Sequence, residues 1–268
     1  MVAYVRLVAT AVAGFGPALG LWLGLPWNLV AFSVIGLALA IGWPALTDVP
    51  ARHSARGVLT GVAALAISLA AVWDGDDAPA LAVAFGLGLG LPACVVRELA
   101  REAPRAHLVR SLAGTASGVG LVSLLGLWAG SDDVATPLRN LLADGPGAAM
   151  DSVTALALAA GFGITGAVIV LGVARVLPAF PHVIELAALA AVAVAAGAGL
   201  GAAWAWGGIG LGWGAAVGGV AGLAPTGLWV IGWHTTALTG RPRLRDLAIV
   251  MVPAAVAAAP VWVAAILR

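Results

Sequence analysis

The chain alternates between long apolar stretches and short polar segments, and this pattern predicts its secondary structure. The apolar stretches are about 20 residues long, which is the length that an α-helix needs to cross a lipid bilayer. Charged residues, proline and glycine gather between them and mark the breaks. We therefore predict an all-α polytopic transmembrane helical bundle, a single membrane domain of about nine spans at residues 4–24, 27–46, 56–73, 79–97, 108–129, 152–176, 183–205, 210–234 and 246–267.

Composition indicates that lipid is the solvent for most of the chain. Of the 268 residues, 62% are hydrophobic and 9% are charged, whereas a soluble domain carries about 25% charged residues. The net charge of +1 does not suggest a nucleic-acid partner, and the single Cys94 excludes an internal disulfide. The first apolar stretch is longer than the core of a signal peptide, so we interpret it as the first span.

Arginine orders the loops. All 13 basic residues are arginine, and the loops that carry them alternate with loops rich in aspartate. Because basic loops face the cytoplasm, we expect a cytoplasmic N-terminus and an extracytoplasmic C-terminus. The lack of lysine, together with many alanines and glycines, is typical of a GC-rich bacterial genome, so we place the chain in the bacterial inner membrane. The cytoplasmic set is Arg6, Arg52, Arg56, Arg97, Arg101, Arg105, Arg110, Arg175, Arg241, Arg243 and Arg245.

The longest outer loop, at 130–151, has two interpretations. Residues 134–142 carry leucines that would face lipid in a short helix lying on the outer surface. The same segment is equally compatible with an ordinary loop.

Part of the chain repeats itself. Residues 50–56 (PARHSAR) align without gaps with residues 104–110 (PRAHLVR), 54 positions later. Two later hairpins, which turn near Pro181 and Pro242, have the same shape. We therefore predict one leading helix followed by four helical hairpin repeats, a build common in transporters, whose site lies between repeats. The alternative is that loops of similar composition resemble one another.

Small residues recur at four-residue spacing in many spans. This spacing lets helix backbones approach closely in lipid. It favours either tight packing within the chain or a homodimer seam. The pairs and triplets are Gly57 and Gly61, Gly86 and Gly90, Gly114 and Gly118, Gly197 and Gly201, and Gly214, Gly218 and Gly222.

Arg56 and Arg110 occupy equivalent positions in the two copies, at the first turn of their spans. A guanidinium binds a carboxylate by two parallel hydrogen bonds. These two residues are therefore candidates for binding an anionic solute. The alternative is that all the inner arginines only orient the protein and contact anionic lipid headgroups.

Ionisable groups within the membrane are usually functional, and few lie near a predicted span. Glu185 and Asp246 open their spans, and His182 precedes Glu185 by three residues. We consider these three as proton-coupling candidates, with structural ion pairing as the alternative. The histidine spacing does not predict a metal site, and we expect no cofactor. Motifs for a phosphate loop, a nucleophile elbow or a metalloprotease are lacking, so we do not expect an enzyme.

Several local motifs recur in the first half of the chain. An arginine opens the first span, a Leu-Pro-Trp turn follows it, and a proline closes the second span. An inner arginine then leads into a threonine-glycine step, and a looser second copy follows. The motifs are Arg6, Leu25-Pro26-Trp27, Trp43-Pro44, Arg52 and Arg56 with Leu59-Thr60-Gly61, and Arg110 with Gly114-Thr115 and Gly118.

In these motifs the chain resembles the fusaric-acid-resistance or aromatic-acid-exporter family of membrane proteins. The resemblance implies proton-motive export of small organic, often aromatic, acids through a helical bundle. It adds Thr60 and Thr115 to the substrate-binding candidates. The chain departs from that family in having no large cytoplasmic domain after about six spans.

Three functional hypotheses follow. The first is a transporter or exporter-like permease for a small organic solute, anionic or aromatic. The second is a non-catalytic structural or accessory subunit of a membrane complex, and the third is a lipid-active membrane enzyme. The partners expected are anionic membrane lipids, a small solute, and a second copy or another subunit, with no nucleic acid.

Overall fold

Helices make up nearly all of the described chain. The computed structural model describes residues 2–23, 27–50, 52–73, 77–101, 107–129, 152–174, 183–206, 209–234 and 242–267. Within these ranges 93% of the residues are helical and none lies in a strand. The predicted all-α fold is therefore confirmed. The predicted surface helix at 134–142 lies outside the described residues.

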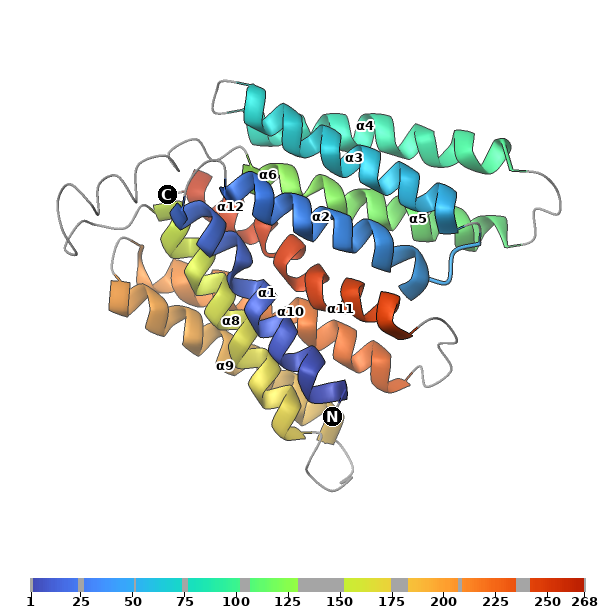
Figure 1. The fold of residues 1–268 in the computed structure, drawn as a ribbon. Coiled ribbons are helices and arrows are strands. Elements are labelled where there is room, and N and C mark those ends of the chain that lie inside the picture. Colours follow the sequence, from blue (N-terminus) through green and yellow to red (C-terminus); the bar gives the residue numbers. More distant parts are fainter. Residues whose placement is uncertain are drawn as a thin grey trace. The chain divides into compact units, whose positions relative to one another are not determined.

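The helices coincide with the nine predicted spans in the described part of the chain (Figure 1). Most ends agree within two residues, and the starts of the third and ninth spans lie four residues earlier than predicted. The helices are α1 (Val2–Leu23), α2 (Trp27–Leu46), α3 (Arg52–Val72), α4 (Ala78–Leu99), α5 (Leu108–Ser123), α6 (Leu125–Ala129), α8 (Ser152–Ala174), α9 (Val183–Trp206), α10 (Leu211–His234), α11 (Pro242–Val256) and α12 (Ala258–Ile266).

Two predicted spans are each made of two helices. Between α5 and α6, the backbone N–H of Leu127 donates to the carbonyl of Leu124 at 3.1 Å in a tighter turn. Between α11 and α12, Pro260 has no N–H to offer the carbonyl of Val256. The N–H of Ala257 still reaches the carbonyl of Pro253 at 3.0 Å, so the interruption is local.

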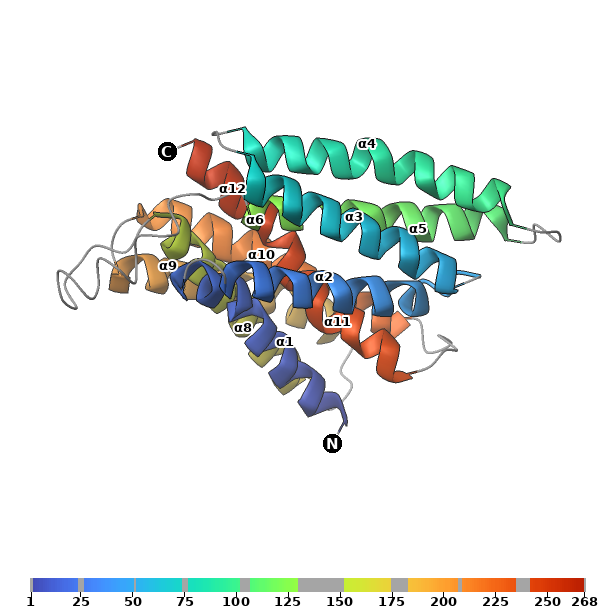
Figure 2. The same ribbon diagram turned by 45° about the horizontal axis from the view of Figure 1, so that its top comes forward.

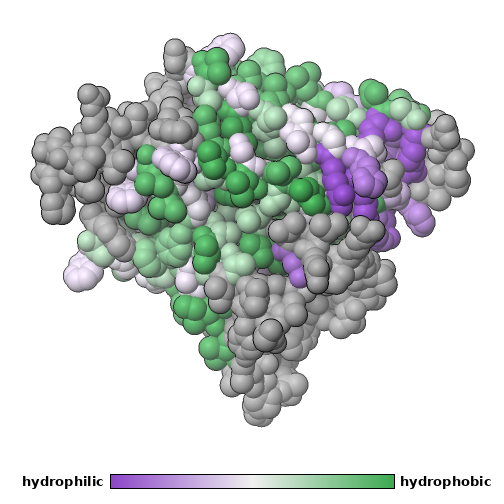
Figure 3. Space-filling model, viewed as in Figure 1, coloured by the Kyte–Doolittle hydropathy of each residue, from purple (hydrophilic) through white to green (hydrophobic). Residues whose placement is uncertain are grey.

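Length and composition indicate a membrane protein. Six of the described helices are long and apolar enough to cross a bilayer. Large apolar side chains are exposed along them, including Phe85, Leu89 and Val96 on α4. Figure 3 shows apolar surface over much of the described part of the visible face, with hydrophilic residues gathered at the end where α3 begins. Such extensive apolar surface is unusual for a soluble monomer.

The chain divides into two compact units. Unit 1 comprises residues 1–28, 133–237 and 252–268, and unit 2 comprises residues 29–132 and 238–251. Unit 1 contains α1, α8, α9, α10 and α12, and unit 2 contains α2 to α6 with the first part of α11.

Unit 1 is held together by close backbone contact among α8, α9 and α10. A Cβ atom on Gly218 of α10 would lie 2.6 Å from the carbonyl oxygen of Ala195 and 2.8 Å from the Cα of Gly199, both on α9. A Cβ on Gly163 of α8 would meet the backbone of Gly218. Only glycine at these positions allows three backbones to approach so closely.

Unit 2 packs α3, α4, α5 and α6 against one another, and Figures 1 and 2 both show α3 and α4 side by side. The α2 helix joins them through Trp43, whose indole N–H donates to the carbonyl of Gly114 on α5 at 2.8 Å. A Cβ on Gly118 would lie 2.5 Å from the Trp43 ring. Phe32 of α2 also stacks on Trp128 of α6, with ring centroids 6.3 Å apart.

The glycine stripes serve different ends. A Cβ added to Gly86, Gly90, Gly114 or Gly118 would collide with a neighbouring side chain in unit 2, and one added to Gly214, Gly218 or Gly222 would collide in unit 1. Packing within the chain therefore accounts for these positions. By contrast, nothing lies within 4 Å of a Cβ added to Gly57, Gly61, Gly197 or Gly201.

Candidate functional site

A basic cavity opens at one end of the helices of unit 2. Its volume is about 480 Å³, within the range of small-molecule sites. Three arginines, two histidines and one aspartate line it together with the backbone turn that joins α2 to α3. The lining residues are Asp48, Val49, Pro50, Arg52, His53, Arg56, His107 and Arg110.

The two helix starts place these side chains. Arg52, His53 and Arg56 occupy the first turns of α3, and His107 and Arg110 flank the start of α5. The first N–H groups of a helix lack internal partners and carry partial positive charge. His107 precedes α5 without making a side-chain capping bond. The cavity therefore combines guanidinium groups with the positive ends of two helices.

Two residues of the cavity adopt left-handed backbone conformations. Asp48 has φ of 51° and His107 has φ of 62°, and they are the non-glycine residues with positive φ in the described part of the chain. Such conformations are uncommon outside glycine and often occur at functional sites. Both residues line this cavity, which sets it apart from the rest of the described chain.

Asp48 bridges two of the arginines. Its carboxylate accepts a hydrogen bond from Nη2 of Arg52 at 2.9 Å and forms an ion pair with Nη2 of Arg110 at 3.3 Å. Arg110 comes from α5, so the pair joins α5 to the turn after α2. The Arg110 side chain is 53% exposed and remains accessible to a ligand.

Arg56 differs from its two neighbours. Its Nε atom is buried and has no hydrogen-bond partner in the structure. A buried guanidinium N–H without a partner is unfavourable, and a ligand can supply the missing acceptor. The cavity contains three guanidinium groups and one carboxylate, which leaves a formal charge of +2 with both histidines neutral.

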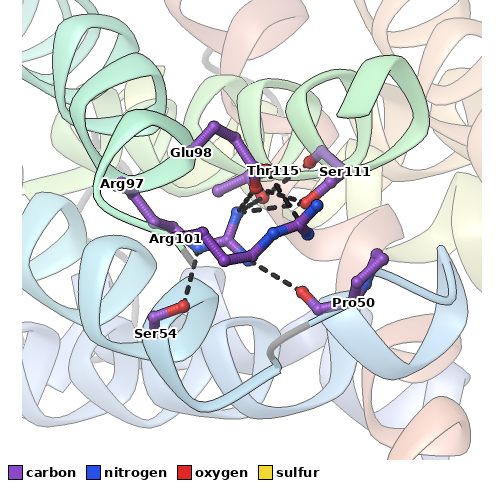
Figure 4. A network of polar contacts seen from close by, with 7 residues as sticks. All are labelled: Pro50, Ser54, Arg97, Glu98, Arg101, Ser111 and Thr115. Carbon is purple, nitrogen blue, oxygen red and sulfur yellow. Dashed lines mark hydrogen bonds and ion pairs between the residues drawn. The ribbon is translucent and has the colours of Figure 1, made fainter. Parts of the chain in front are cut away.

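Behind the cavity lies a buried polar network centred on Arg97 of α4 (Figure 4). Its Nε donates to the hydroxyl of Ser54 at 2.8 Å, and Nη2 donates to the carbonyl of Pro50 at 2.8 Å. Its Nη1 donates to Oε1 of Glu98 at 2.6 Å and to Oγ1 of Thr115 at 3.0 Å. One side chain therefore joins α3, α4, α5 and the turn after α2.

Glu98 is the anionic partner of this network. The side chains of Arg97 and Glu98 are 6% and 4% exposed. The Ser111 hydroxyl donates to Oε1 of Glu98, and Arg101 approaches Oε2 at 3.4 Å. A buried ion pair needs such additional hydrogen bonds to offset the loss of hydration.

Pro50 connects the network to the cavity. Its carbonyl accepts the bond from Arg97, and the same residue lines the cavity. The turn that carries Asp48 is therefore anchored from behind by a residue on another helix. Arg97 acts as a positioning residue and is not itself among the residues that line the cavity.

The structure brings some predicted site residues together and separates others. Arg56 and Arg110 line one cavity. Thr60, one turn further along α3, is exposed, and Thr115 is fully buried in the Arg97 network. The predicted repeat itself stays a prediction, although the equivalent residues His53 and His107 also line the cavity.

The proton-coupling candidates lie elsewhere. Glu185 is exposed at the start of α9 in unit 1, and Asp246 is half-buried on the part of α11 that belongs to unit 2. His182 lies outside the described residues. Proton coupling by these residues stays a prediction.

The sequence pattern did not predict the Arg97 network. Two signals were available. Arg97 and Glu98 form a charged pair at the end of an apolar stretch, and Ser111 and Thr115 are spaced to share one face of α5. Asp48 was also missed as a cavity residue, since its contact with Arg110 joins segments 62 positions apart.

Comparison with known proteins gives no relative for this chain. No family model matches it, and neither a curated protein nor a solved structure is significantly similar to it.

Proposed function

We propose that this protein is a membrane permease of the exporter type, which binds a small organic anion at the basic cavity of unit 2. The observation that supports this proposal is the convergence of Arg52, Arg56 and Arg110 on one cavity, with an Nε of Arg56 that has no partner. A cluster fulfilling only a structural role would satisfy its own hydrogen bonds, as the Arg97 network behind it largely does.

The chemistry of the cavity suits an oxyanion. Each guanidinium offers two parallel N–H groups that match a carboxylate or phosphate. The uncapped start of α5 adds backbone N–H groups. Since the membrane interface excludes part of the surrounding water, these interactions are stronger there than in bulk water.

We place the cavity at the cytoplasmic face of a bacterial inner membrane. The arginine-rich ends of the helices support this orientation by the positive-inside rule. An exporter would then take up its solute from the cytoplasm, as the resemblance to aromatic-acid exporters implies. Anionic lipid headgroups are a further proposed partner of the exposed arginines.

The proposed orientation can be tested by labelling single cysteines. In a Cys94→Ala background, we expect Asp76→Cys to react in intact cells with a membrane-impermeant thiol reagent. Arg105→Cys should react only after the membrane is opened. Reaction of position 105 from outside would show that the orientation is wrong.

Conservative substitutions test the role of the cavity. Arg56→Lys and Arg110→Lys keep the positive charge but remove the two-pronged donor. A hydrogen bond to a charged group contributes about 1.5–3 kcal/mol, so we expect each variant to transport organic anions into proteoliposomes roughly tenfold less efficiently. Topology and expression should be unchanged because charge is kept.

Arg6→Lys is the matched control for this experiment. It makes the same change on the same proposed membrane face, but in unit 1. Transport by Arg6→Lys should equal that of the original protein. Full transport by an Arg56→Lys, Arg110→Lys double variant would contradict the proposed site.

A second candidate function is that of a non-catalytic subunit of a membrane complex. Gly57 and Gly61 favour it, because they are exposed on α3 and leave open space beside the helix. A helix of a second copy or of another subunit can pack closely on such a surface. The two functions separate in the same assay, since this one predicts no transport by purified protein.

A further inference from the structure

We infer that the basic cavity selects a doubly charged phosphate monoester over singly charged anions, and that Asp48 is the residue that imposes this selectivity. The inference rests on the proposed anion site and narrows its ligand. It follows from what already occupies the cavity.

Asp48 is a built-in monoanion. Its carboxylate lies 2.9 Å from Nη2 of Arg52 and 3.3 Å from Nη2 of Arg110. A free monocarboxylate offers the arginines the same functional group. The tethered carboxylate has a high effective concentration, so a free carboxylate of equal charge competes poorly with it.

A dianion is not limited in this way. With Asp48 in place, the cavity keeps a formal charge of +2 from three arginines and one aspartate. Attraction scales with the product of the charges, so a dianion gains about twice the attraction of a monoanion from the same cavity. A phosphate monoester carries a charge of about −1.5 to −2 at neutral pH and offers three acceptor oxygens.

The polar groups around the cavity also suit a phosphate. Arg56 and Arg110 begin different helices, and their guanidinium groups can reach separate oxygens of one tetrahedral group. The uncapped N–H groups at the start of α5 resemble helix starts that bind phosphate. The cavity volume of about 480 Å³ leaves room for an organic substituent.

Phosphate monoesters occur both as small soluble molecules and as lipid headgroups. The experiment compares glycerol phosphate with glycerate, a monoanion of similar size, by calorimetric titration of the full chain in nanodiscs. We expect glycerol phosphate to bind at least about tenfold more tightly. In a second arm, nanodiscs containing phosphatidic acid, a phosphate monoester, are compared with nanodiscs containing phosphatidylglycerol, a monoanionic diester.

Binding of glycerol phosphate indicates a soluble ligand. Stabilisation by phosphatidic acid alone indicates the headgroup source, and either result supports the selectivity. Equal or tighter binding of glycerate would overturn this inference. If that binding were still lost in Arg56→Lys, the proposed anion site would stand.

Asp48→Asn tests the selecting residue. Asparagine keeps the shape and tolerates the left-handed backbone. Removing the internal competitor should strengthen glycerate binding more than glycerol phosphate binding, and reduce their ratio to about threefold or less. Asp77→Asn, the same charge change outside the cavity, should leave the ratio unchanged.

Weaker binding of both ligands by a folded Asp48→Asn variant would overturn the selecting role, because it would show that Asp48 only holds the arginines in place. Folding is checked through the buried thiol of Cys94, which reacts with a thiol-specific dye when unit 2 opens. If Asp48→Asn did not fold, Asp48→Ser would test the same prediction, since it also removes the competing charge.

Discussion

Replacing Arg97 with methionine should strongly destabilise unit 2. The substitution leaves the Glu98 carboxylate buried, with the Ser111 hydroxyl and the more distant Arg101 as its remaining partners among the contacts described above. Removing one partner of a buried ion pair costs about 3–5 kcal/mol. The measurement is thermal unfolding of the purified protein in detergent, followed by the reaction of Cys94 with a thiol-specific dye. Cys94 is buried one turn before Glu98 on α4, so it reports opening of this region.

Two further variants separate the charge effect from lost packing. Arg97→Met combined with Glu98→Gln removes both charges, and we expect it to be more stable than Arg97→Met alone. Arg52→Met breaks the more exposed pair with Asp48, whose side chains are 30% and 35% exposed. Such a pair contributes about 0.2–1 kcal/mol. An Arg97→Met variant no less stable than Arg52→Met would contradict the stabilising role of the network.

The helices could be predicted because their signal is local. Apolar length alone placed the spans, and the errors have local causes. Arg52 continues α3 beyond its apolar part and pairs with Asp48 four residues earlier. Pro242 begins α11 four residues before the predicted start, since proline suits the first turn of a helix, where its missing N–H is not needed.

The site could be predicted only in part because it depends on contacts between distant segments. Arg56 and Arg110 were identified from their equivalent positions in two similar loops. The Arg97 network was missed because neighbouring residues on a helix do not normally face each other. Here Arg97 and Glu98 lie in the last turn of α4 and interact directly. The bond from Arg97 to Pro50 joins positions 47 apart and follows from packing, not from local pattern.

Glycine spacing illustrates the same limit. The pattern in α9 and α10 was equally regular, with Gly197 and Gly201 on one helix and Gly214, Gly218 and Gly222 on the other. Only the structure shows that the α10 set meets a neighbouring helix, whereas the α9 pair has open space beside it. The residue that contacts the backbone of α10 from α9 is Gly199, which lies between the two spaced glycines.

Gly218→Ala should therefore destabilise unit 1, although alanine is normally the better helix former. Its Cβ would lie 2.6 Å from the carbonyl oxygen of Ala195 and 2.8 Å from the Cα of Gly199. Both atoms belong to the backbone of α9, so relief requires the helices to separate. Overpacking of this kind costs about 1–3 kcal/mol, and separation also loosens the contact of Gly163 with Gly218. The measurement is loss of helical circular dichroism during denaturation in mixed micelles.

Gly219→Ala and Gly197→Ala are matched controls from the same two helices. A Cβ on Gly219 would make an ordinary contact at 3.4 Å with Ala196, and one on Gly197 would meet nothing within 4 Å. Replacing glycine by alanine inside a helix is favourable by about 0.5–1 kcal/mol where space allows. The controls should therefore be as stable as the original protein or slightly more stable, opposite in sign to Gly218→Ala. Equal stability of all three variants would show that the helices do not pack as closely as their glycines allow.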